Sequence, residues 1–307
     1  MKVKHFWLYL KGIAMGSADV VPGVSGGTIA FITGIYTELL DSIKSINIES
    51  LIILFKQGPK SAWKAINGTF LITLFAGILT AILTLAKVIH YLLDQHAVLL
   101  WSFFFGLILA SSLHMGKQIK KWPPSTLIAL LVGALFAGFI SIASPTSIEP
   151  SYLNIFIAGS IAICAMILPG ISGSFILLLM GLYAPVLAAV KGLQLDIMLI
   201  FALGAGIGLI LFSRLLSWLL HHYQDLMFSI LTGFMLGALL KVWPWKQTIS
   251  YRLNSKGQEV AFEQLNRLPE WTSSDQITTA LALAVIGFAC VLLLEKLSVN
   301  DNEEQVS

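Results

Sequence analysis

Two glycine-rich segments of this 307-residue chain can expose backbone amide groups, and each interrupts a long apolar stretch. They are PGVSGG at 22–27 and PGISGS at 169–174. Proline and glycine break a regular helix, and the helix that restarts presents uncovered N–H groups and the positive end of its dipole. Such an end binds anions, phosphate among them. The residues that would supply amides and hydroxyls to an anion are Gly23, Ser25, Gly26, Gly27, Thr28, Gly170, Ser172, Gly173 and Ser174.

A plainer interpretation of the two breaks stays open. Ser25 and Ser172 can cap the restarted helices, donate hydroxyl groups to a ligand, or do both. The whole segment can also be a packed kink, in which small residues let helices approach closely. A kink alone does not require the pattern PGxSG twice, so we favour a binding site.

Four ionisable residues lie within the apolar segments: Asp19, Glu38, Lys87 and Arg214. An unpaired charge costs at least about 2.5 kcal/mol at the bilayer centre, so each is a functional hypothesis. Lys87 and Arg214 can offset the charge of an anion, or they can extend to the membrane surface. Asp19 can take up a coupling proton or sodium ion, or form an ion pair at a helix end. Glu38 has the same coupling hypothesis, although its position favours the membrane interface.

The composition excludes an ordinary soluble protein. Apolar residues make up 57% of the chain and charged residues 11%, against about 25% charged in a soluble domain. The net charge of +3 lacks the basic excess of a nucleic-acid binder. The two cysteines and six histidines show no metal-ligand spacing. We therefore expect a polytopic membrane protein with no nucleic-acid partner, no metal and no cofactor.

A bilayer-spanning helix needs about 20 apolar residues, and six stretches meet that length. They are 69–93, 97–115, 126–143, 197–220, 226–243 and 276–295. Regions 12–40 and 152–190 contain the breaks, and we predict a re-entrant or broken helical hairpin in each. The first arm, 12–21, has only about ten residues, or about 15 Å, and cannot cross, whereas the second region is long enough to span. Residues 2–11 are typical of an interfacial helix.

The chain repeats itself. An offset of 147 aligns PGVSGGTIAFITGIY (22–36) with PGISGSFILLLMGLY (169–183), with seven identities in fifteen positions. Further on, an offset of 127 pairs Gly77 with Gly204 and Lys87 with Arg214, so the first half has a longer loop. Each half, 1–150 and 151–307, is then a broken hairpin followed by three spans. An odd number of spans inverts the second copy, so we predict an all-α fold of two inverted repeats, with the substrate site between them.

The positive charges predict an orientation. Eleven lysines fall on the side of the N-terminus, against six lysines and arginines on the other side. The positive-inside rule therefore places both termini in the cytoplasm.

The segments GSADVVPGVSGGTIAFITGIY (16–36) and AMILPGISGSFILLLMGLY (165–183) resemble those of a bacterial inner-membrane family linked to polyprenyl-phosphate translocation (PopT-type). The resemblance extends over essentially the whole chain. It implies transport of undecaprenyl phosphate, the C55 lipid carrier of cell-wall precursors, from the outer to the inner leaflet for reuse. Together with the residues above, it implies a phosphate site at the two breaks, with Lys87 and Arg214 offsetting the charge and the repeats rocking to alternate its exposure.

Three alternatives compete with this hypothesis. A secondary transporter of a small soluble anion would use the same helix ends. A membrane enzyme acting on a lipid phosphate is disfavoured, because the sequence has no arginine-rich motif or Cys/His nucleophile. A scaffold is disfavoured because intramembrane charges and broken helices are costly features. The sequence does not indicate the oligomeric state.

Overall fold

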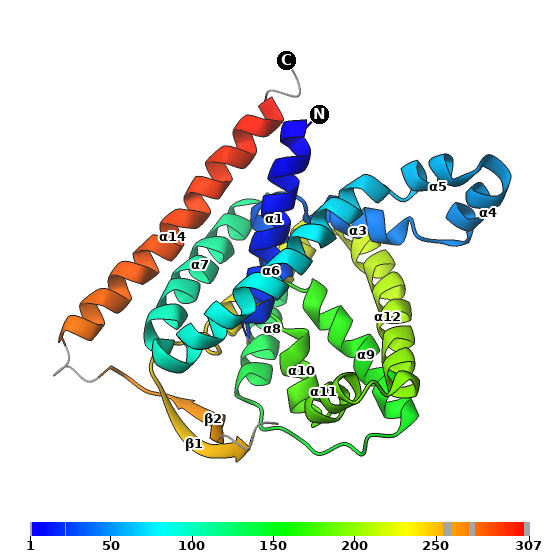
Figure 1. The fold of residues 1–307 in the computed structure, drawn as a ribbon. Coiled ribbons are helices and arrows are strands. Elements are labelled where there is room, and N and C mark those ends of the chain that lie inside the picture. The colour runs from blue at the N-terminus through cyan, green and yellow to red at the C-terminus, as the bar shows by residue number, and fades with distance from the viewer. Residues whose placement is uncertain (1, 22, 254–258, 270–273, 304–307) are drawn as a thin grey trace.

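Helices dominate the computed structural model, which describes residues 2–21, 23–253, 259–269 and 274–303 (Figure 1). Pro22 of the first break lies outside the described residues. The first half holds α1 (Lys2–Val20), α2 (Gly26–Ile32), α3 (Tyr36–Lys44), α4 (Ile48–Gln57), α5 (Pro59–Ala65), α6 (Gly68–Gln95), α7 (Ala97–Lys117) and α8 (Pro124–Ile142). The second half holds α9 (Tyr152–Ile167), α10 (Gly173–Leu179), α11 (Tyr183–Lys191), α12 (Leu195–His222), α13 (Gln224–Ala238), β1 (Lys246–Leu253), β2 (Glu259–Asn266) and α14 (Ser274–Glu303).

Five helices of the described chain are long and apolar enough to cross a membrane: α6, α7, α8, α12 and α14. They coincide with five of the six predicted spans, and the chain is an all-α polytopic membrane protein. The sixth stretch, 226–243, differs from the prediction, because α13 ends at Ala238 after 15 residues, or about 22 Å. The chain turns there, and the amide of Lys241 donates to the carbonyl of Ala238 at 2.9 Å.

The N-terminal arm also differs from the sequence prediction. We expected an interfacial helix at 2–11 and a separate arm at 12–21, but Lys2–Val20 is one helix, α1, of 19 residues and about 28 Å. Close packing against α6 supports it. A Cβ on Gly12 would collide with the carbonyl oxygen of Leu74, so only glycine allows the two helices to approach this closely.

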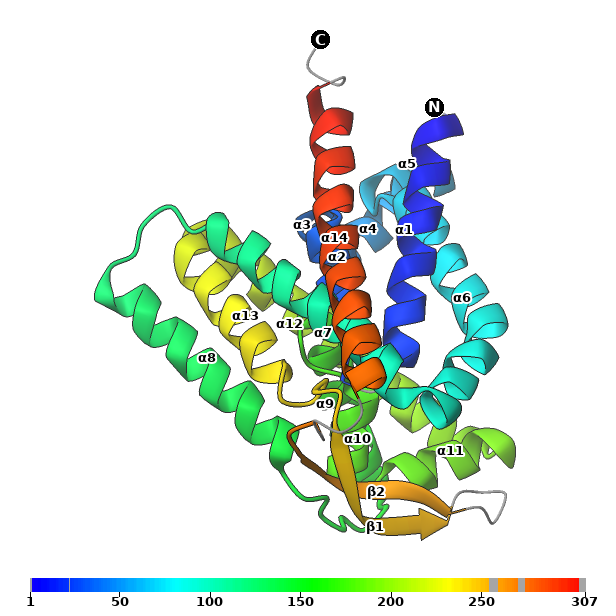
Figure 2. The same ribbon diagram turned by 90° about the vertical axis from the view of Figure 1, so that its left-hand side faces the viewer.

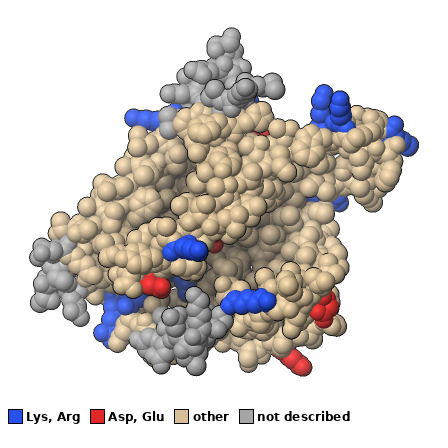
Figure 3. Space-filling view, in the orientation of Figure 1, with Lys and Arg blue, Asp and Glu red and all other residues tan. Residues whose placement is uncertain are grey.

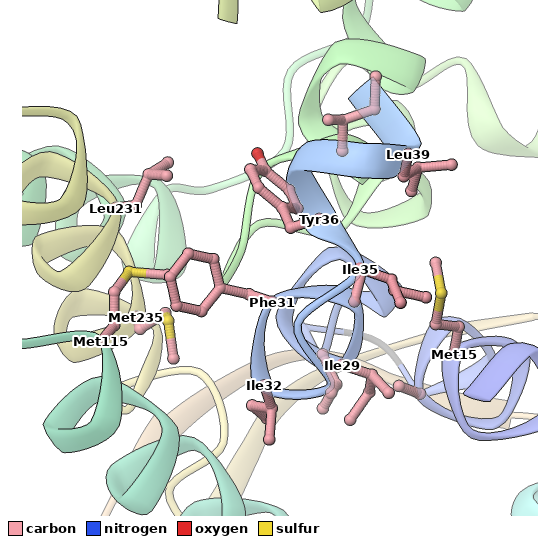
Figure 4. Packing of buried hydrophobic residues seen from close by; sticks show 14 of the residues in the cluster. Met15, Ile29, Phe31, Ile32, Ile35, Tyr36, Leu39, Met115, Leu231 and Met235 are labelled. Atoms are coloured by element: carbon pink, nitrogen blue, oxygen red, sulfur yellow. The ribbon is translucent and has the colours of Figure 1, made fainter. Parts of the chain in front are cut away.

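The two breaks lie largely inside the protein, although Ser174 at the end of the second is exposed. All seven residues of α2 are buried, and its Phe31 ring packs against Phe228 with centroids 5.5 Å apart. Figure 4 shows Phe31 pointing toward Met235 of α13, with Ile35 on the opposite side. In the second half, the axes of α10 and α11 differ by 111°, so this pair is a broken span or a re-entrant loop. Protein surrounds the breaks, which is the condition under which irregular backbone is tolerated at membrane depth.

The two halves have matching elements in the same order. Helices α2 and α10 both have 7 residues, α3 and α11 both have 9, and α6 and α12 both have 28. Gly23 and Gly170 have φ of +87° and +84°, and Gly34 and Gly181 have φ of +72° and +73°. The longer connection in the first half, which accounts for the change of offset, contains α4 and α5.

The halves are interlocked by their long helices. Helix α8 packs along α13 of the other half, and α14 packs along α7 (Figure 2). Glycines mark both crossings, because a Cβ on Gly133 would collide with the carbonyl of Ile230, and one on Gly287 with that of Phe103. The larger hydrophobic core therefore draws residues from both halves, and a smaller cluster around Ile155 and Leu182 lies within the second half.

The ends of the molecule differ in character. The start of α1 and the end of α14 lie at one end, and the β1–β2 hairpin lies at the other (Figures 1 and 2). The sequence patterns did not predict this antiparallel hairpin, which lies in the connection between the predicted spans 226–243 and 276–295. On the face shown in Figure 3, most of the surface between the two ends is uncharged, and lysines gather over the projecting α4 and α5. Large apolar side chains such as Leu83, Leu135 and Leu199 are exposed on the long helices, as contact with lipid requires.

Candidate functional site at the two helix breaks

Ser25 caps the helix that restarts after the first break. Its backbone is extended (φ −124°, ψ 135°), and its hydroxyl oxygen accepts a hydrogen bond from the amide of Gly27 at 3.1 Å. The same hydroxyl donates to the carbonyl of Met166 in α9 at 2.9 Å. Ser25 therefore joins the first break to the helix that leads into the second break.

Asp19, near the end of α1, lies against the start of α2. Its carboxylate accepts a hydrogen bond from the amide of Gly26 at 2.7 Å. A carboxylate at this position is stabilised by the positive end of the α2 dipole. The amides of Gly26 and Gly27 are thus already bonded within the protein, which differs from the open anion cradle that the sequence suggested.

The second break has a different hydrogen-bond pattern. The amide of Gly170 donates to the hydroxyl of Thr28 at 3.1 Å, so the two breaks are in direct contact. Ser172 makes no capping bond to α10, and its hydroxyl lies 3.0 Å from that of Ser174. The same motif therefore forms a closed, capped turn in the first half and a less satisfied one in the second.

The other sequence candidates lie elsewhere. Lys87 on α6 and Arg214 on α12 are exposed, as snorkelling side chains would be. Glu38 on α3 accepts a hydrogen bond from the side-chain amide of Asn67 at 3.0 Å, at the connection to α6. The structure thus brings together the glycine, serine and threonine candidates and Asp19, but it does not bring Glu38, Lys87 or Arg214 to the breaks.

Two lysines that the sequence patterns did not single out lie beside the breaks, Lys241 at the end of the predicted span 226–243 and Lys246 just after it. Lys241 follows α13, and its Cγ lies 2.5 Å from where a Cβ on Gly23 would be. Its ammonium group is 3.8 Å from the ring centroid of Phe175 in α10. The Lys246 ammonium donates to the carbonyl of Lys241 at 2.6 Å and lies 3.8 Å from the ring centroid of Trp101 in α7.

These lysines are the basic groups beside the breaks, and burial disfavours their charged forms. Burial lowers the pKa of Lys241 to about 8, and burial together with the smaller effect of the neighbouring Lys241 lowers the pKa of Lys246 to about 7. Among the side chains that the structure describes, neither ammonium group forms an ion pair with a carboxylate. The sequence signal was present in KVWPWK (241–246), where two lysines flank a rigid aromatic segment. It was missed because tryptophan and lysine are also typical of a membrane boundary.

The comparisons with known proteins agree with one another. Residues 15–260, which include both breaks and both lysines, match the undecaprenyl phosphate translocase-like family. A polyprenyl-phosphate transporter of Vibrio cholerae is 57% identical over 293 residues, which cover 94% of this chain and 95% of that protein. A polyprenyl-phosphate transporter of Staphylococcus aureus is 35% identical over 258 residues, covering 76% of this chain and 85% of that protein. No solved structure matches the chain. By the extent of these matches, the chain belongs to the undecaprenyl phosphate translocase-like family.

Proposed function

We propose that this protein moves undecaprenyl phosphate from the outer to the inner leaflet of the bacterial inner membrane, so that the lipid carrier is reused in cell-envelope synthesis. The relatives are named as transporters of polyprenyl phosphate and not as enzymes, which supports translocation without chemistry. The observation that carries the proposal is that two helix breaks from different halves meet beside two lysines, which have no carboxylate partner among the described residues.

The physical demand on such a protein is small. The isoprenyl tail remains in the hydrocarbon of the bilayer during the crossing, so only the phosphate must be sheltered. An ionised phosphate is too costly to cross lipid alone, because charges lose their hydration there. A cationic position inside an otherwise apolar bundle lowers that cost.

Alternating access follows from two inverted repeats, 1–150 and 151–307, that rock against each other. Contacts between α3 and α12 support a state closed at the end where α1 begins. There the hydroxyl of Ser217 donates to the carboxylate of Asp41 at 2.7 Å, and the Lys44 ammonium donates to Ser217 at 3.1 Å. Within the described chain, no comparable packing joins the equivalent helices α11 and α6. In our proposal this closed end, with both termini, faces the cytoplasm.

Coupling to an ion is the finer part of the proposal. Asp19 is the candidate for a coupling proton or sodium ion, because it is an acidic residue at the break and its repeat equivalent is Met166. Glu38 is the weaker candidate, since it contacts Asn67 at the periphery. Proteoliposomes with imposed proton or sodium gradients test this: the wild type should respond to one gradient and Asp19→Asn should not.

The main experiment follows labelled undecaprenyl phosphate between the leaflets of proteoliposomes. We expect its movement to exceed that in protein-free vesicles by at least tenfold, while undecaprenol, which lacks the phosphate, shows no protein-dependent movement. Inorganic phosphate trapped inside the same vesicles serves as the second substrate. Release of inorganic phosphate without movement of the lipid would replace the proposal with a soluble-anion transporter.

A further inference from the structure

We propose that Lys241 and Lys246 form the binding subsite for the phosphate monoester that this protein carries. The proposal rests on the proposed function and names the residues that would hold the headgroup. The sequence motifs predicted that backbone amides of the glycine-rich breaks bind the phosphate. In the structure, the side chains of Lys241 and Lys246 lie beside those breaks.

Lys241 contacts the first break and the helix that follows the second break. Its side chain passes over Gly23 in the first break and ends above the ring of Phe175 in α10, which follows the second break. Any side chain at position 23 would occupy the space of the Lys241 methylenes, and φ of +87° there also favours glycine. This glycine therefore makes room for a cation instead of offering its amide to an anion.

Lys241 and Lys246 are held close to each other. Lys246 donates to the carbonyl of Lys241, so its position depends on the turn that carries Lys241. Its ammonium faces the ring of Trp101, which is only 8% exposed. Two like charges held near each other repel, and an aromatic face offsets only part of the lost hydration.

Among the described residues, no carboxylate balances the charge of the two lysines. Asp19, the acidic residue at the break, bonds to the amide of Gly26 and forms no ion pair with Lys241 or Lys246 among the described residues. A phosphate monoester carries about −1.5 to −2 charges at neutral pH and has three acceptor oxygens. That charge matches two ammonium groups better than a carboxylate or a single monoanion would.

The test measures binding of undecaprenyl phosphate to the purified protein in detergent. We expect Lys241→Gln and Lys246→Gln each to weaken binding at least tenfold, and Lys241→Arg and Lys246→Arg to stay within about threefold of the wild type. The matched control is Lys191→Gln, which removes a lysine from α11 and should leave the affinity unchanged. Wild-type affinity in both Gln variants would overturn the subsite.

Competition identifies the source of the phosphate group. Inorganic phosphate at millimolar concentration should displace the lipid if the subsite recognises phosphate alone, whereas undecaprenol should not displace it. Displacement by undecaprenol as strong as by undecaprenyl phosphate would mean that the tail determines binding, and would overturn the proposal.

A second measurement on the wild type avoids the risk that a variant fails to fold. Undecaprenyl phosphate should slow modification of Lys241 and Lys246 by an amine-reactive reagent at least fivefold, without protecting Lys191. Equal rates with and without the lipid would overturn the subsite while leaving translocation intact. A wild-type protein that does not bind undecaprenyl phosphate at all would instead overturn the proposed function.

Discussion

The two halves of this protein have turns of the same backbone conformation, but different groups pack against those turns. Gly23 and Gly170 adopt nearly the same positive φ, yet Gly23 packs on the Lys241 side chain and Gly170 on the backbone of Phe234. Ser25 caps its helix and Ser172 does not. A duplicated scaffold can thus keep its turns, which depend on glycine, while its side chains diverge to give one site.

The same contrast holds for the cations. The offset of 127 pairs Lys241 with His114, whose ring nitrogen lies 3.1 Å from the carboxylate of Glu295. His114 therefore has an acidic neighbour between α7 and α14, and Lys241 has none among the described residues. Of these two equivalent positions, only Lys241 therefore has a charge that no described carboxylate balances. A single substrate site would require such a difference between the halves.

The largest expected effect comes from cross-linking α3 to α12, which contact each other although their equivalents α11 and α6 do not pack comparably within the described chain. In a variant without Cys164 and Cys290, Asp41→Cys with Ser217→Cys should cross-link rapidly with a short thiol reagent, because the two native side chains are in contact. Cross-linking should lower lipid translocation at least tenfold if the halves must separate there. The repeat-equivalent pair, Ala188→Cys with His90→Cys, should cross-link only during transport. Equal cross-linking of both pairs at rest would contradict rocking.

The next effect tests the equivalence of the scaffolds. Gly77→Leu and Gly204→Leu should each destabilise the protein by about 1–3 kcal/mol or more, because the side chain would collide with the carbonyl of Tyr9 or of Phe156. Melting temperature in detergent measures the loss. The matched control is Gly206→Leu in the same helix as Gly204, where a Cβ has no neighbour within 4 Å. If Gly204→Leu lowered the melting temperature and Gly77→Leu did not, the two glycines would not be structurally equivalent.

A smaller effect separates the two serines. Ser25→Ala should cost about 0.5–2 kcal/mol, because it removes a helix cap and a bond to Met166. Ser172→Ala should cost clearly less, since among the described residues its hydroxyl hydrogen-bonds with that of Ser174 and caps no helix. Chemical unfolding of the two variants side by side gives the comparison. Equal losses would mean that the second break is capped in the same way as the first.

The smallest expected effect concerns the paired membrane cations. Both Lys87 and Arg214 are exposed, so Lys87→Gln and Arg214→Gln should keep translocation within about twofold of the wild type. Flux assays with matched protein insertion measure this. A decrease in lipid translocation of more than tenfold in either variant would indicate that the residue contacts the substrate during transport.

Much of the fold was predictable from local patterns. Apolar stretches of about 20 residues identify helices such as α6 and α12 without knowledge of their partners, because the bilayer sets their length. The offset of 147 aligned Gly34 with Gly181, and both have the positive φ that favours glycine. The length of α1, the early end of α13 and the β1–β2 hairpin were not anticipated, since neighbouring elements decide where such segments continue.

The sequence alone determined the class of protein, the positions of the breaks and their duplication. Composition and glycine placement act locally, so a linear pattern carries them. Only the tertiary structure decided which charges meet the breaks: it left Lys87 and Arg214 on the surface and brought Lys241 and Lys246 against Gly23 and Trp101. Residues 23 and 241 are distant in the chain, and their contact depends on how α13 ends and packs against α8. That is a property of the whole fold, which no spacing within the sequence encodes.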